Sequence, residues 1–296
     1  MQVSGYLKLS VAVALATIAL KTAAWWVSGS VGPLSDALES LVNLAGATFA
    51  LAMVTIAARP PDDDHPYGHH KAEYFSSGFE GVLIGAAALA IVWTAVQRLL
   101  NPQPLEALGL GLALSVLASV LNGALAWSML RKAREVHSVA LEGDARHLMT
   151  DVWTTAGVVL GLGAVAATGW TWLDPLLAIA VAANILREGL RLVRRSVGGL
   201  MDEALDARSQ AAIQQVLDGF AHPAIRFDHL TTRRAGQRRF ADLHMHMPAG
   251  WTLRRAAALR GEVEQALMSA VPGLRATIQL LPMDVEAHLD DPRDPI

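Results

Sequence analysis

Long apolar stretches fill the first two thirds of this chain and constrain its fold more than any other feature. The clearest runs from Ala107 to Leu130 and contains no charged residue. A helix needs about 20 mostly apolar residues to cross a bilayer. Six stretches reach that length alone or with their flanks: Leu9 to Val27, Leu34 to Ala58, Gly81 to Val96, Ala107 to Leu130, Val152 to Leu173 and Leu173 to Leu190. The sequence therefore predicts a six-helix transmembrane bundle over residues 1–200.

Charged residues are scarce and unevenly placed. Of 296 residues, 53% are hydrophobic and 17% are charged, whereas soluble domains are roughly a quarter charged. The formal net charge is −3 and no cluster of Lys and Arg resembles a phosphate-binding surface, so we expect no nucleic-acid partner. Because the chain has no Cys, a bound metal would need His, carboxylate, amide or water ligands.

Lys and Arg lie in alternate connections between the apolar stretches. They occur within residues 59–71, 131–146 and 191–195, and are missing from 28–33, 101–104 and 168–170. Positively charged loops stay in the cytoplasm. The pattern predicts a multi-pass protein of the cytoplasmic (inner) membrane with both termini in the cytoplasm. Arg98 does not fit this charge pattern, because it lies near the outer end of the third stretch.

After Met201 the composition becomes that of a soluble domain. Its periodicity predicts a helix over 207–220, strands over 225–232 and 239–247, a helix over 252–269 and a strand over 276–281. This order favours a cytoplasmic α+β ferredoxin-like domain over residues 201–283. Residues 284–296 are acidic and contain Pro, so we expect a disordered tail.

Two of the predicted spans carry polar residues at the same i, i+3, i+7 spacing, which places each set on one helical face. The two sets are Asp36, Glu39 and Asn43, and Asp144, His147 and Asp151. Ionisable groups at membrane depth are costly and mark ion pathways. The alternative, which applies mostly to Asp36 and Asp144, is that these residues join helices or lie at helix ends.

The deepest members of the two sets offer two carboxylates, an imidazole and an amide oxygen: Glu39, Asn43, His147 and Asp151. These donors suit divalent Zn, Fe, Mn, Co or Ni.

The connection between the second and third spans is a second candidate site. Asp62, His65 and His69 could converge on one cation, with His70 and Glu73 nearby. The alternative is a solvated loop with a Pro-x-Gly turn.

In the predicted strand 239–247, alternation assigns one face to the core and the other to polar side chains. The core face is Ala241, Leu243, Met245 and Met247, and the other face is Phe240, Asp242, His244 and His246. The polar face could bind a metal, but a solvated or subunit-facing surface is the simpler interpretation.

Four segments together resemble the cation diffusion facilitator family, from about residue 5 to 282. They are residues 39–43, the loop 62–73, His147 with Asp151, and residues 200–206. The resemblance, to the ferrous-iron/zinc efflux branch, implies a homodimeric divalent-metal/proton antiporter that exports metal from the cytoplasm. It implies Zn, Fe, Mn, Co, Ni or Cd as substrate and protons as counter-ion, with no enzymatic activity.

Carried over residue by residue, the resemblance implies a mid-membrane transport site at Glu39, Asn43, His147 and Asp151, and a loop site at Asp62, His65 and His69. In that family the first pair of transport-site residues is often two Asp, or His and Asp. Here the pair is Glu39 and Asn43, so one side chain is longer and the site has one charge fewer. At the family's C-terminal metal cluster, the matching positions here are Asp228, His244, Ala257, Gln279 and Leu281.

Only Asp228 and His244 of that set could ligate a metal, helped by His229 or His246, so we predict a weakened or absent cluster. Dimerisation would then depend more on packing. Two other functions compete with transport. A membrane metalloenzyme is disfavoured because the chain has no His-Glu-x-x-His run or nucleophile elbow. A membrane-anchored metal sensor without transport leaves the buried acids unexplained.

Overall fold

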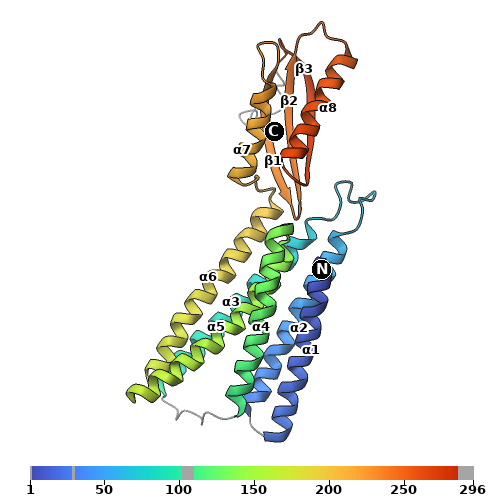
Figure 1. The fold of residues 1–296 in the computed structure, drawn as a ribbon. Helices are drawn as coiled ribbons and strands as arrows, with labels where there is room; N and C mark the ends of the chain where they lie inside the picture. Colours follow the sequence, from blue (N-terminus) through green and yellow to red (C-terminus); the bar gives the residue numbers. More distant parts are fainter. Residues whose placement is uncertain (1, 29–30, 102–109, 286–296) are drawn as a thin grey trace. The chain divides into compact units, whose positions relative to one another are not determined.

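The computed structural model describes residues 2–28, 31–101 and 110–285 (Figure 1). For some helical residues, Glu39 and Asp36 among them, the side chain lies outside what is described. The chain divides into two compact units, Met1–Leu200 and Met201–Ile296. The expected disordered tail falls almost wholly within 286–296, outside the described residues.

The first unit contains six helices within the described residues (Figure 1). They are α1 (Val3–Ser28), α2 (Val31–Ala57), α3 (Ala72–Leu100), α4 (Leu110–Val136), α5 (Val139–Thr168) and α6 (Leu173–Leu200). By length and composition, two described stretches could cross a membrane, Ala72–Leu100 and Val139–Val165. Shorter apolar helical stretches lie at Val3–Ala19 and Asn43–Ala57.

The helices extend beyond the apolar stretches that predicted them. We expected a span from Val152, but α5 begins at Val139. The polar residues before Val152 are helical because they face the bundle interior, so charge was a poor guide to the helix start. Ser138 caps α5 by accepting a hydrogen bond from the Leu141 backbone N–H over 3.3 Å, and Gly169, with φ 74°, ends it.

Helices α3 and α6 approach each other closely through glycines. A Cβ on Gly189 would lie 2.9 Å from the carbonyl oxygen of Gly81 and 3.0 Å from the backbone N of Gly85. A Cβ on Gly81 would likewise lie 2.9 Å from the carbonyl oxygen of Gly189. Small residues allow helix backbones to touch inside a membrane. This seam of Gly81, Gly85 and Gly189 fixes α3 against α6.

An ion pair accounts for the unexpected Arg98. Its Nη1 lies 3.2 Å from Oδ2 of Asp174, in the first turn of α6. Asp174 is 8% exposed, so the arginine neutralises a largely buried acid. Arg98 therefore serves a local structural role, which a count of loop charges does not register.

The second unit is an α+β domain built from α7 (Ala207–Phe220), β1 (Arg226–Ala235), β2 (Arg238–Met247), α8 (Leu253–Ala270) and β3 (Leu274–Pro282). The sheet order is β1-β2-β3, with β1 antiparallel and β3 parallel to the central β2. The core contains side chains from both helices and the sheet. It includes the predicted inward face of β2: Ala241, Leu243, Met245 and Met247.

Candidate metal site

Three of the four predicted transport-site residues meet between α2 and α5. The amide of Asn43 lies between the other two. Its Nδ2 donates to Oδ2 of Asp151 over 2.6 Å, and its Oδ1 lies 2.6 Å from Nε2 of His147. Asn43 and His147 are buried. Glu39, one helical turn before Asn43, has its side chain outside the described residues.

The hydrogen bonds orient these groups as possible ligands. Because the NH₂ group of Asn43 is engaged by Asp151, the amide oxygen faces the imidazole. The Asn43 amide thus contacts an imidazole nitrogen through its oxygen and a carboxylate through its nitrogen. Such a mixed N/O set suits a divalent transition metal and not a soft monovalent one.

Asp144, one turn before His147, is also inside the bundle. It is 1% exposed, and its Oδ2 has no hydrogen-bond partner within the described residues. An acid in this position is not at a solvated helix end, which was one of the two structural interpretations of the sequence. Asp36, its counterpart on α2, has a side chain outside the described residues.

Sequence reasoning missed two polar residues of this site. Asn122 on α4 donates from Nδ2 to Oδ2 of Asp151 over 3.1 Å. Glu80 on α3 is fully buried, and its Oε2 lies 3.4 Å from Nδ1 of His147. Asn122 carries no charge, so its stretch passed as uniformly apolar, and Glu80 directly precedes the predicted span at Gly81. A search for isolated polar residues within or beside apolar helices could have found both.

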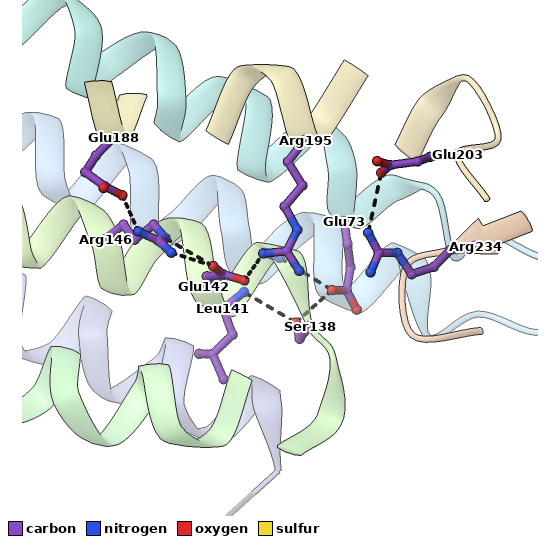
Figure 2. Close-up of polar contacts among 10 residues, drawn as sticks. Glu73, Ser138, Leu141, Glu142, Arg146, Glu188, Arg195, Glu203 and Arg234 are labelled. Carbon is purple, nitrogen blue, oxygen red and sulfur yellow. Dashed lines mark hydrogen bonds and ion pairs between the residues drawn. The ribbon is translucent and has the colours of Figure 1, made fainter. Parts of the chain in front are cut away.

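Beside the site, a chain of ion pairs joins α5 to α6 (Figure 2). Arg146 donates to Oε1 of Glu142 over 2.9 Å and also bonds Glu188, and Arg195 bonds the other oxygen of Glu142. The four side chains alternate in sign and are partly buried, so each charge has an opposite neighbour. This explains how Glu188 is accommodated within the predicted span Leu173 to Leu190: its partner Arg146 comes from a connection that the sequence marks as charged.

Glu73 does not belong to the loop site beside which the sequence placed it. It is 2% exposed, and its Oε2 accepts a hydrogen bond from the Ser138 hydroxyl over 2.7 Å (Figure 2). Ser138 is the N-cap of α5, so this bond ties the start of α3 to the start of α5.

The three predicted loop residues do come together. Asp62 Oδ1 accepts from the His65 backbone N–H over 2.7 Å, and its Oδ2 lies 3.3 Å from Nε2 of His69. The His65 and His69 rings are 4.4 Å apart between centroids. The His65 backbone hydrogen bond lowers the pKa of Asp62 from its ordinary value, which keeps the carboxylate charged. The turn ends at Gly68, whose φ of 85° suits glycine. One atom from each of the three side chains could bind a common cation.

In the second unit, Asp228 and His244 are cross-strand partners and His246 lies beside them. Asp228 Oδ1 lies 3.4 Å from Nδ1 of His244, and its Oδ2 lies 3.0 Å from Nε2 of His246. The register of β1 shifts between Asp228 and Thr231, and bulges of this kind redirect side chains. Both histidines are buried, so this part of the β2 face is not solvated as the simpler interpretation assumed.

Family models match nearly the whole chain. The cation efflux transmembrane domain matches residues 7–201, and the cytoplasmic domain of cation efflux proteins matches residues 205–283. An uncharacterized transporter of Synechocystis, sll1263, is 45% identical over 94% of this chain and 90% of its own length. The cation-efflux pumps FieF of Klebsiella pneumoniae and Salmonella arizonae are each 32% identical over 93% of this chain and 91% of theirs. The chain therefore belongs to the cation diffusion facilitator family of membrane metal-cation efflux proteins, on the branch that contains FieF.

Proposed function

We propose that this protein exports a divalent transition metal from the cytoplasm in exchange for protons, by alternating access at the site around His147. The observation that carries the proposal is the buried contact of Asn43, His147 and Asp151. Isolated carboxylates and imidazoles in a membrane interior mark ion pathways. Glu39 would complete the site as its second carboxylate.

Proton coupling follows from the chemistry of the ligands. A metal binds the deprotonated carboxylate and the neutral imidazole, so protons and metal compete for the same atoms. A site that turns outward with metal and returns with protons exchanges one for the other. Zn, Fe, Mn, Co, Ni and Cd all suit these donors, and transport assays must rank them.

The remaining features of the proposal concern topology and assembly. We infer six membrane spans, α1 to α6, in an inner membrane, with both termini and the domain of residues 201–283 in the cytoplasm. The match of residues 205–283 to the family's cytoplasmic domain supports a homodimer.

Two accessory metal sites accompany the transport site in this proposal. The loop site of Asp62, His65 and His69 would bind an ion before or beside the transport site. In the second unit, Asp228 and His244, with His246, would bind one ion at most, and weakly. A binuclear cluster there in a metal-soaked crystal would contradict this part.

The experiment is metal uptake into proteoliposomes under an imposed pH gradient, with each of the six metals tested separately. We compare the intact protein with Asp151→Ala, and use Asp218→Ala, an exposed acid on α7, as the matched control. Uptake should follow the pH gradient, vanish in Asp151→Ala and persist in the control. Uptake that ignores the gradient would refute proton exchange.

A metal sensor without transport is the alternative. It predicts stoichiometric binding to the purified protein and no uptake of any metal into vesicles. Binding and uptake measured on one preparation therefore separate the two functions.

A further inference from the structure

Glu80 is a buried acid for which the proposed ligand set has no role. It lies on α3, its side chain is fully buried, and neither carboxylate oxygen has a hydrogen-bond partner within the described residues. Across from it, Nδ1 of His147 is also buried without a hydrogen-bond partner. The two lie 3.4 Å apart. Buried polar groups are normally hydrogen-bonded, so this facing pair requires a functional explanation.

The surrounding backbone leaves room for the Glu80 side chain. A Cβ on Gly46 of α2 would lie 2.6 Å from Oε1 of Glu80, and a Cβ on Gly143 of α5 would lie 3.4 Å from its Cγ. Gly46 is three residues after Asn43, and Gly143 is four residues before His147. The two ligand-bearing helices therefore each place a glycine against Glu80, which allows its carboxylate to reach the imidazole.

The two nitrogens of His147 have different surroundings. Nε2 faces the oxygen of Asn43 at 2.6 Å, toward Asp151, while Nδ1 faces Glu80. An imidazole that binds a metal through one nitrogen carries its hydrogen on the other, and that N–H usually donates to a carboxylate or carbonyl. Without metal, Nε2 donates its hydrogen to the Asn43 oxygen. A metal that replaced that hydrogen on Nε2 would require the hydrogen on Nδ1, where it faces Glu80.

We propose that Glu80 is a positioning residue of the transport site, which accepts a hydrogen bond from Nδ1 of His147 and so holds Nε2 toward the divalent ion. The inference rests on the proposed function, because it presupposes that His147 binds the transported metal. Glu80 itself need not touch the ion. Its role is to fix the tautomer and orientation of the ring, as carboxylates commonly do behind metal-binding histidines.

Substitutions at Glu80 test this role in the full-length protein. Glu80→Leu fills the space without an acceptor, and Glu80→Gln keeps an acceptor oxygen without the charge. The matched control is Glu73→Gln, which changes another buried acid of α3, one bonded to Ser138 and not to His147. Loss of a carboxylate behind a ligating histidine typically weakens metal affinity about 10–100-fold. We expect that range for Glu80→Leu, a smaller loss for Glu80→Gln, and wild-type affinity for the control.

Two readouts distinguish positioning from a structural role. The first is Zn²⁺ or Cd²⁺ affinity in detergent, by competition with a chelator. The second is the ¹⁵N chemical shifts of the His147 ring with Zn²⁺ bound, assigned by comparison with His147→Gln. The wild type should show hydrogen on Nδ1 and metal on Nε2, and Glu80→Leu should lose that single tautomer.

Gly46→Ala reaches the same carboxylate without altering it. The new Cβ would displace Oε1 of Glu80, which is the end of a flexible side chain, so the helices need not move. We expect weaker metal binding in Gly46→Ala and no further loss in Gly46→Ala/Glu80→Leu relative to Glu80→Leu alone, because both changes remove one interaction. If Glu80→Leu does not fold, Gly46→Ala and Glu80→Gln still test the inference.

Unchanged affinity and unchanged His147 shifts in the Glu80 variants would overturn the inference, while wild-type uptake continued to support the proposed function. A wild type that binds no metal, or binds it without uptake, would instead refute the proposed function. Equal losses in Glu80→Gln and Glu73→Gln would also overturn the inference, since both effects would then be structural.

Discussion

The seam between α3 and α6 predicts that one methyl group on Gly189 destabilises the bundle. In Gly189→Ala, the new Cβ would lie 2.9 Å from the Gly81 carbonyl oxygen, where ordinary contact begins at 3.4 Å. The shortfall is about 0.5 Å, and the two nearest atoms, from Gly81 and Gly85, belong to backbone, which cannot rotate away. The two helices must therefore separate along the seam.

The magnitude follows from two opposing effects. Overpacking of this kind typically destabilises by about 1–3 kcal/mol. Replacing Gly by Ala in a helix contributes about 1 kcal/mol in the other direction. Gly85→Ala is the matched control, because a Cβ on Gly85 meets nothing within 4 Å although its own backbone lines the seam. The propensity effect cancels between the two variants, so Gly189→Ala should be less stable than Gly85→Ala by about 1–3 kcal/mol.

The assay is unfolding of the purified protein in mixed micelles by SDS titration, followed by far-UV circular dichroism. Both variants and the wild type are compared at one detergent composition. Equal unfolding free energies for Gly189→Ala and Gly85→Ala would refute the inferred backbone contact. A second substitution at Gly81 should not restore the stability of Gly189→Ala, because glycine is already the smallest residue.

Two further predictions each concern the hydrogen bonds of one side chain. Asn122→Leu removes the 3.1 Å hydrogen bond to Asp151 and should weaken metal binding about tenfold. The control Asn184→Leu, at an exposed position of α6, should bind metal as the wild type does. Equal affinities of the two variants would show that Asn122 is not part of the site. Asp206 caps α7 by accepting from the Ser209 N–H over 3.0 Å, so Asp206→Ala should lower the unfolding free energy of the second unit by about 1 kcal/mol at pH 7. Hydrogen bonds from Ser209 lower the pKa of Asp206, so this contribution is complete above the unfolded pKa of about 4 and is lost as the pH falls through the lower folded value. A difference between the two proteins that persists unchanged in acid would contradict this assignment.

The second unit was predictable in detail because its periodicity is strong. Helix α7 begins and ends where the sequence predicted, and the alternation along β2 correctly separated Met245 in the core from His244 on the opposite face. What periodicity could not reveal was the shift in register after Asp228, which depends on His229 adopting a positive φ of 50°. That shift brings Asp228 beside His246, a pairing that no spacing within one strand indicates.

The candidate metal site in the first unit was less predictable, because its residues come from four helices. Spacing could place His147 and Asp151 on one face of α5, and that face does meet Asn43. It could not show that Glu80 and Asn122 reach the same place from α3 and α4. Their roles depend on helix rotation and on glycines of neighbouring helices, which a linear sequence does not express.

The alternating charges of Glu188, Arg146, Glu142 and Arg195 have a consequence for how ions approach the protein. Arg191 also pairs with Glu188, so each of the two acids contacts two arginines and the cluster does not attract a cation. Its field is in any case screened beyond the Debye length of about 8 Å at physiological salt. The run Asp62 to Asp64 instead places three acids next to one another, between the more distant Arg59 and Lys71. Attraction of a dilute divalent ion is therefore left to the loop, and the rate of metal capture should fall with ionic strength in proportion to the charge of those three residues.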